Sequence, residues 1–219
     1  HLSIRRQRQM CIRDRFNRYK VNPEIRTLII GDSHTQYAVD DNILDNALNV
    51  SQSSEGYMYS YYKLSTILKK NPQLNTVILG YSYHNTSSYY DNIMSIPEYA
   101  SRYFFIVPIC SKYEILKANR HQIGELISSV LKQGKGNLLK PTTYTFIGNF
   151  ENITDRSLRL NEGAVNRRIR FQYYDSGRVK GLATINLQYL EKIIDLCKKT
   201  KVRLIPVSYT HLRAHETVL

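Results

Sequence analysis

The sequence predicts an α/β fold: a parallel sheet with helices on both faces, which is a three-layer α/β/α sandwich. Short apolar runs, each ending in a glycine or in polar residues, lie at 27–31, 47–51, 75–80 and 202–206. Stretches with helical spacing of apolar residues lie between several of these runs. Runs of this kind are typical of buried strands in parallel sheets, where ligands bind beyond the carboxyl ends of the strands.

The two ends of the chain share an inverted nucleotide repeat. Residues 10–14 can be encoded by ATG TGT ATA AGA GAC, and the reverse complement encodes Val-Ser-Tyr-Thr-His, which stands at 207–211. Both ends therefore resemble translated transposase adapters from sequencing libraries. We expect residues 1–15 and 207–219 to be adapter-derived tails and residues 16–206 to be one truncated domain.

Composition is that of one globular domain with a basic surface. The net charge of +13 falls to +9 without the two tails, because they hold six arginines and two acidic residues. Cys110 and Cys197 lack any metal-like spacing and are expected in the core. No apolar run could span a membrane, and we expect the native N-terminus, with any signal peptide or anchor, to be missing.

The first predicted strand ends in Gly31-Asp32-Ser33-His34. Glycine lets the backbone turn sharply, and the backbone N–H groups that follow can stabilise an oxyanion. This pattern predicts Ser33 as a nucleophile at the carboxyl end of a strand, with Asp32 orienting the turn. The alternative is that one of the two side chains only caps a helix.

The next segments continue the α/β alternation. Apolar residues at helical spacing predict a helix over 40–47, with Asp40 or Asp41 as its N-cap. The second strand leads into a polar loop over 51–56, and a helix is predicted over 57–70. Four tyrosines crowd the start of that helix, and one or two of them could present a ring to a sugar.

The third strand ends in Gly80, followed by Tyr81-Ser82-Tyr83-His84-Asn85. The order strand-Gly-Asp-Ser, strand-loop-glycine and strand-glycine-polar loop resembles the SGNH/GDSL hydrolase superfamily. The resemblance covers about 27–85 together with the last helix and strand. It implies a flavodoxin-like α/β/α sandwich and acyl transfer through a serine.

The resemblance also implies roles for single residues. Ser33 would be the nucleophile and, through its backbone N–H, an oxyanion donor. Gly56 best matches the glycine that supplies the second donor, although it could be only a turn residue. The third donor is usually an asparagine in Gly-x-Asn-Asp. Ser82 stands at that position here, so Ser82, His84 or Asn85 would have to supply the donor.

The superfamily's catalytic Asp-x-x-His follows the last strand, and no such motif occurs within 16–206. We therefore expect the catalytic aspartate and histidine beyond the truncation and a nearly inactive fragment. His34 and His84 could both face the site, and either could act as the base. Alternatively, both histidines only form hydrogen bonds with loops.

Residues 86–184 are predicted to be a largely helical insertion. Helical spacing predicts a helix over 113–131, and we interpret 134–136, Gly-Lys-Gly, as a linker because it lacks phosphate-loop spacing. A helix over 187–197 and the strand at 202–206 then restore the alternation.

The later half of this insertion is strongly basic and contains aromatic residues. Its cations are Arg156, Arg159, Arg167, Arg168, Arg170, Arg178 and Lys180, and its aromatic residues include Phe171, Tyr173 and Tyr174. This composition favours contact with an acidic glycan or a membrane surface. No nucleic acid is expected, because no recognised binding motif is present.

Together these observations predict a serine esterase or O-acyltransferase that acts on an acylated cell-envelope carbohydrate or another small ester, without cofactor or metal. The resemblance to bacterial enzymes that modify polysaccharides implies a periplasmic or membrane-anchored protein, and a cytoplasmic one stays open. One alternative is a non-catalytic glycan-binding relative. The other is a calcineurin-like metallophosphoesterase, because Asp32-Ser33-His34 matches Asp-x-His, although its further Gly-Asp and Gly-Asn-His motifs are not found.

Overall fold

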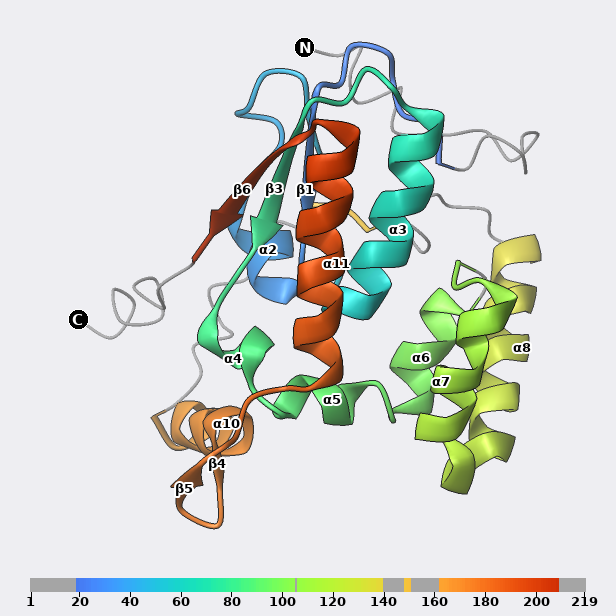
Figure 1. Cartoon of the computed structure of the whole chain (residues 1–219). Helices are drawn as coiled ribbons and strands as arrows, with labels where there is room; N and C mark the ends of the chain where they lie inside the picture. The colour runs from blue at the N-terminus through green and yellow to red at the C-terminus, as the bar shows by residue number, and fades with distance from the viewer. Residues whose placement is uncertain (1–18, 105, 140–147, 151–161, 209–219) are drawn as a thin grey trace.

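The computed structural model describes residues 19–104, 106–139, 148–150 and 162–208. These residues form a mixed α/β structure around a four-stranded parallel sheet (Figure 1), with strand order β2-β1-β3-β6. The strands are β1 (Thr27–Ile30), β2 (Ala47–Asn49), β3 (Thr76–Gly80) and β6 (Arg203–Val207). Each of the four predicted strands is therefore confirmed to within two residues at either end.

The sheet extends one residue into the predicted C-terminal tail. Val207 is the last residue of β6, where it pairs with Gly80, and its carbonyl accepts a hydrogen bond from the Tyr81 N–H at 2.9 Å. The sheet therefore reaches one residue past the boundary that the sequence predicts after Pro206. Ser208 is exposed, and the other residues of both predicted tails, within 1–18 and 209–219, lie outside the description.

Two long helices cover one face of the sheet. α3 (Tyr57–Lys70) and α11 (Ile185–Thr200) pack side by side in front of the strands in Figure 1. Their inward residues include Ile67 and Cys197, both buried. Burial raises the pKa of the Cys197 thiol to about 11, which fits a packing role. The side chain of Cys110 lies outside the description.

The predicted helix over 40–47 is wrong. The chain forms a short helix, α2 (Ser33–Ala38), immediately after β1 and then a series of turns. The Asp40 Oδ1 atom accepts the Asn42 N–H at 2.8 Å, and the Asp41 Oδ2 atom accepts the Asn49 N–H at 2.9 Å. A local bond such as that of Asp40 gives the backbone an alternative to a helix, the Asp41 bond ties the turns to β2, and Ile43 is left exposed.

Helix α2 lies behind the sheet in Figure 1, against the ends of β1 and β3. Thr35 on this helix is fully buried, and a Cβ atom at Gly80 would lie 1.9 Å from the Thr35 Oγ1 atom. A Cβ atom at Gly31 would lie 2.3 Å from the same oxygen. The two glycines that end β1 and β3 thus allow α2, and the residues at its start, to approach the sheet closely.

We expect Gly80→Ala to lower the free energy of unfolding by about 1–3 kcal/mol, because the new methyl group overlaps Thr35. Adding Thr35→Ala should recover most of this loss, since it removes the Oγ1 atom and leaves the closest Thr35 atom at 3.2 Å. Urea unfolding followed by circular dichroism measures both effects. Gly124→Ala is the control, because its Cβ meets nothing within 4 Å. A Gly80→Ala cost that Thr35→Ala leaves unchanged would contradict this packing.

The described part of the predicted insertion is largely helical. The described helices between β3 and α11 are α4 (Tyr83–Thr86), which ends where the insertion begins, α5 (Tyr89–Ile93), α6 (Pro97–Tyr103), α7 (Lys112–Ala118), α8 (Ile123–Leu139) and α10 (Glu162–Tyr173), with 3-10 turns η1 (Ile109–Ser111) and η2 (Arg120–Gln122). The helix predicted over 113–131 is interrupted at η2. Residues 134–136 lie inside α8 rather than in a linker, because a helical glycine costs only about 1 kcal/mol.

The insertion forms two groups at opposite sides of the molecule. Helices α6, α7 and α8 pack together on one side, whereas α10 and the hairpin β4 (Tyr174–Asp175)/β5 (Arg178–Val179) lie below α4 on the other (Figure 1). Ser176 and Gly177 both have positive φ angles, 50° and 81°, which suits a tight two-residue hairpin turn. Across the described residues, the helices lack the length and apolar character needed to cross a membrane.

Candidate active site

The candidate site lies at the carboxyl edge of the sheet, where the loops after β1 and β3 meet. From β1 the chain continues to β2 on one side, and β3 lies on the other side. The order in which strands are added to the sheet therefore reverses at β1, and ligands bind at such a point in open α/β sheets. Asp32 and Ser33 follow β1, and Ser82 to Asn85 follow β3, so the structure places both predicted groups at this point.

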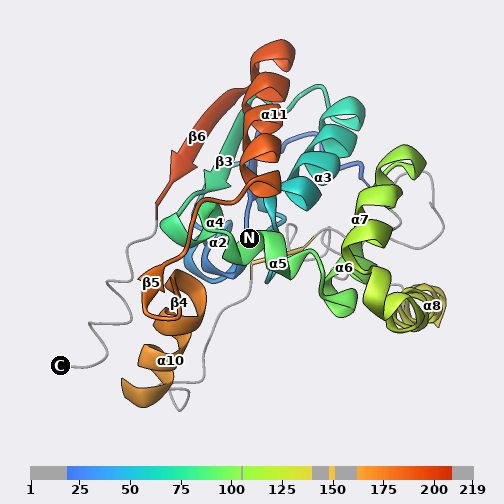
Figure 2. The same ribbon diagram turned by 60° about the horizontal axis from the view of Figure 1, so that its bottom comes forward.

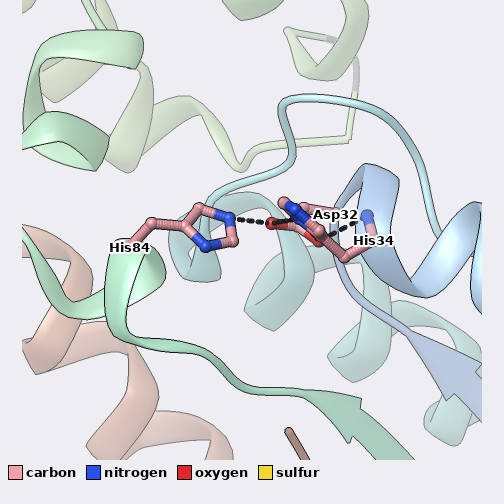
Figure 3. Close-up of side chains that lie close together, drawn as sticks. All are labelled: Asp32, His34 and His84. Atoms are coloured by element: carbon pink, nitrogen blue, oxygen red, sulfur yellow. Dashed lines mark hydrogen bonds and ion pairs between the residues drawn. The ribbon is translucent and has the colours of Figure 1, made fainter. Parts of the chain in front are cut away.

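Asp32 is the centre of the site (Figure 3). Its side chain is 3% exposed, and its Oδ1 atom caps α2 by accepting the His34 N–H at 2.9 Å. The Oδ2 atom accepts hydrogen bonds from His84 Nε2 at 2.7 Å, Asn85 Nδ2 at 2.9 Å and the Tyr90 hydroxyl at 2.7 Å. One carboxylate therefore joins the β1 loop to α4 and α5.

The charge of Asp32 is stabilised by these donors. Burial alone would raise the pKa of this carboxyl, but the hydrogen bonds and positive charges of His34 and His84 hold the pKa well below its usual value. The Tyr90 hydroxyl shows the opposite shift, because burial and the Asp32 charge raise its pKa well above the ordinary range. Tyr90 therefore remains a neutral donor to an ionised Asp32.

Ser82, His84 and Asp32 form a hydrogen-bonded chain with the connectivity of a catalytic triad. The Ser82 Oγ atom lies 2.6 Å from His84 Nδ1, and His84 Nε2 faces Asp32. Asn85 determines the proton positions in this chain. The Asn85 Nδ2 atom faces the Asp32 carboxylate, because a carboxylate can only accept a hydrogen bond. The Asn85 Oδ1 atom therefore faces Ser82 Oγ at 2.7 Å. Because an amide oxygen also only accepts, the Ser82 hydroxyl must be the donor in this bond.

It follows that the Ser82 hydroxyl is directed at Asn85 and accepts the Nδ1–H of His84. His84 then donates from both ring nitrogens and forms an ion pair with Asp32. A serine activated for attack would instead donate its proton to the imidazole. In this arrangement, the network holds the two loops together and does not activate Ser82.

Ser33 is placed differently from Ser82. It is the first residue of α2, half-buried, and its Oγ atom has no hydrogen-bond partner within the part of the chain that the structure describes. His34 follows it on the helix, with a side chain that is 26% exposed and an Nδ1 atom 3.4 Å from the Asp32 carboxylate. The His34 and His84 rings lie 4.4 Å apart.

Gly56 is buried at the N-cap of α3. The next residue, Tyr57, donates its N–H to the Asn186 Oδ1 atom at 2.6 Å, and Asn186 Nδ2 donates to the Asn85 carbonyl at 2.6 Å. Asn186, in the first turn of α11, thereby connects the start of α3 to α4. A Cβ atom at Gly56 would lie 3.1 Å from Asn186 Oδ1, so this connection requires a glycine or a small shift.

Sequence reasoning missed Tyr90 and Asn186. Tyr90 is one of many tyrosines, and Asn186 looks like an ordinary residue of a helix start. Their partners lie 58 and 129 residues away along the chain, so no local pattern could indicate them.

A buried ion pair supports the loop that carries Gly56. Glu55 and Lys63 are fully buried and bonded to each other. Lys63 Nζ also donates to the Val50 carbonyl at 2.6 Å, and the Ser60 and Tyr103 hydroxyls donate to Glu55 at 2.7 and 3.1 Å. Burial raises the pKa of Glu55 and lowers that of Lys63.

We expect Lys63→Met to lower the free energy of unfolding by about 3 kcal/mol at pH 7, because it leaves the Glu55 carboxylate buried without its cation. The double variant Glu55→Gln/Lys63→Met should recover part of this loss, since no buried charge remains. Chemical denaturation of the three proteins measures the coupling. If the double variant were less stable than Lys63→Met, burial of the charge would not be the cause.

Asp32, His34 and His84 could in principle hold a metal ion, because one ligand atom from each lies within 4.8 Å of the others. Two histidines and a carboxylate suit several divalent metals. However, the Asp32 Oδ2 atom already accepts three hydrogen bonds and both nitrogens of His84 are engaged. A metal would have to displace these contacts, so the residues fit a hydrogen-bonded cluster better than a metal site.

Comparison of the chain with protein-family models, curated proteins and solved structures finds no match. The residues of the site and their geometry therefore carry the functional proposal.

Proposed function

We propose that the protein is a serine esterase or O-acyltransferase of the SGNH type, with Ser33 as its nucleophile. The observation that carries the proposal is the position of Ser33, half-buried at the carboxyl end of the central strand β1, beside a β3 loop tied to it through Asp32. The strand order β2-β1-β3-β6 supports it, because it agrees with the first four strands of a flavodoxin-like sheet.

In this proposal each residue has a defined role. Ser33 Oγ attacks the ester carbonyl, and the backbone N–H groups of Ser33 and Gly56 donate to the oxyanion. Asp32 stays ionised and holds the turn, so it takes no proton. Ser82 and Asn85, predicted as donors to the oxyanion, bond to each other and brace the β3 loop. The base in this proposal is a histidine of an Asp-x-x-His segment, which the SGNH resemblance implies after the last strand of the sheet.

The substrate in this proposal is an acylated carbohydrate of the cell envelope, where the protein would be periplasmic or membrane-anchored. Ester cleavage and acyl transfer share the first step, in which Ser33 receives the acyl group and the sugar oxygen leaves with a proton. They differ only in whether water or another hydroxyl accepts the acyl group. The site geometry is compatible with both outcomes.

The test is to identify the serine that reacts with a fluorophosphonate probe. A protein that joins this domain to an Asp-x-x-His segment after β6 is labelled, and the adduct is mapped by peptide mass spectrometry. We expect the adduct on Ser33, and none in Ser33→Ala. An adduct on Ser82, or no adduct at all, would reject the proposal.

The cluster of Asp32, His34 and His84 provides the observation that favours the second candidate, a metallophosphoesterase. The same protein preparation distinguishes the two functions. Hydrolysis of an aryl phosphate that EDTA abolishes and Zn²⁺ or Mn²⁺ restores would support the metallophosphoesterase. Hydrolysis of an aryl acetate that is insensitive to EDTA would support the serine enzyme.

A further inference from the structure

A row of aromatic rings leads from the surface to the candidate site. The Tyr83 side chain is 50% exposed and stacks on Tyr173, with ring centroids 5.7 Å apart and planes 14° apart. Tyr173 in turn meets His84 edge to face at 6.4 Å, and His84 contacts His34. The row ends at the Asp32 carboxylate, next to Ser33.

A second aromatic pair lies on the same group of elements. Tyr89 of α5 and Phe171 of α10 meet edge to face at 5.3 Å, and the Lys180 ammonium lies 5.9 and 5.7 Å from their ring centroids. The Phe171 side chain is 64% exposed. Aromatic surface and positive charge are therefore combined at one place.

The two pairs are held next to the site by backbone hydrogen bonds. The Ala183 N–H donates to the Thr86 carbonyl at 2.7 Å, and the Ser88 N–H donates to the Gly181 carbonyl at 2.8 Å. These bonds attach the segment after the β4-β5 hairpin to the end of α4 and to the residues that follow it. Figure 2 shows α10 and the hairpin beside α4, the helix that carries Tyr83 and His84.

Helix α10 and the β4-β5 hairpin, beside which these rings lie, are basic. Arg170 and Arg178 are exposed, and Lys180 is half-buried. Over residues 162–180 the sequence has five cations and two acidic residues. We call Tyr83, Tyr89, Phe171, Tyr173, Arg170, Arg178 and Lys180 the aromatic-basic face.

We propose that the aromatic-basic face binds an acidic polysaccharide and presents its acyl groups to Ser33. Aromatic rings pack against the apolar faces of sugars, and arginines bind carboxylates with charge-assisted hydrogen bonds. The row of rings runs from the surface to the Asp32 site, so it favours a ligand long enough to reach from the surface to Ser33. An acylated glycan is such a ligand. The substrate role rests on the proposed function, whereas binding itself does not.

The probe is a short oligogalacturonate, titrated by calorimetry into the full chain at physiological salt, with a dextran oligomer as the neutral comparison. We expect measurable affinity for the acidic oligomer and at least tenfold weaker binding of dextran. Tyr83→Ala and Arg178→Gln should each weaken binding about three- to tenfold. Tyr113→Ala and Lys117→Gln are the matched controls, because both residues are exposed on the distant helix α7, and we expect changes below twofold.

Three results would overturn the proposal. The first is no heat of binding with the acidic oligomer, and the second is equal loss in the α7 controls, which would indicate diffuse charge attraction. The third is tighter binding of oligouridylate that depends on the same residues, which would identify a nucleic-acid surface. Ser33→Ala should bind the oligomer normally, so ester hydrolysis that persists in this variant would argue against Ser33 as the nucleophile and not against this binding face.

Discussion

Ser33→Ala is expected to lower kcat for an aryl acetate on the order of 10³-fold or more in a protein that joins this domain to an Asp-x-x-His segment. A serine enzyme without its nucleophile retains only the rate that the oxyanion donors and substrate binding provide. The measurement is initial-rate kinetics with enzyme in excess of any contaminating esterase. Because Ser33 is half-buried and its side chain has no hydrogen-bond partner among the described residues, the variant should fold with an almost unchanged melting temperature.

Ser82→Ala is the matched control for this experiment. The two serines occupy the same edge of the sheet, but the Ser82 hydroxyl donates to Asn85 and accepts from His84. Its loss should reduce kcat by about tenfold through disorder of the β3 loop, and it should also lower stability. If Ser82→Ala abolished activity and Ser33→Ala did not, the chain Ser82-His84-Asp32 would be the catalytic triad and the proton positions derived above would be wrong.

The sheet and the approximate position of the site were predictable from the sequence. β1 is a run of apolar residues, and Leu28, Ile29 and Ile30 are all fully buried in the centre of the sheet. Since parallel strands have their carboxyl ends at one edge, the polar residues after Gly31 and Gly80 had to meet there. The glycines were also informative, because the structure shows how closely Thr35 approaches both.

The contacts that hold the site were not predictable. Asp32 was expected to orient a turn or to cap a helix, yet it accepts hydrogen bonds from four residues in three separate segments. Asn186 contacts residues more than 100 positions away. Such pairings depend on the three-dimensional packing of the helices, to which periodicity and local motifs are insensitive. The helix predicted over 40–47 does not form for a local reason: hydrogen bonding by the aspartate side chains outweighed the helical spacing of the apolar residues.

Asp32→Ala is expected to lower the free energy of unfolding by about 4–6 kcal/mol at pH 7. Removing one partner of a buried ion pair costs about 3–5 kcal/mol, and loss of the α2 cap adds about 1 kcal/mol. The variant leaves His84, Asn85 and Tyr90 without their shared acceptor. Asp195→Ala, at an exposed carboxylate on α11, is the control and should leave the stability nearly unchanged.

The pH dependence identifies the charge of Asp32 as the cause. The folded state holds the pKa of this carboxyl below the usual value of 3.8, so its stabilising contribution is complete above that value and disappears as the pH falls through the lower folded pKa. Wild type and Asp32→Asn should therefore differ most in urea unfolding at neutral pH, and the difference should shrink as the pH falls below 3.8. A difference that stays constant down to pH 2.5 would show that the two side chains differ in hydrogen bonding alone, and that the ion pair with His84 does not stabilise the site.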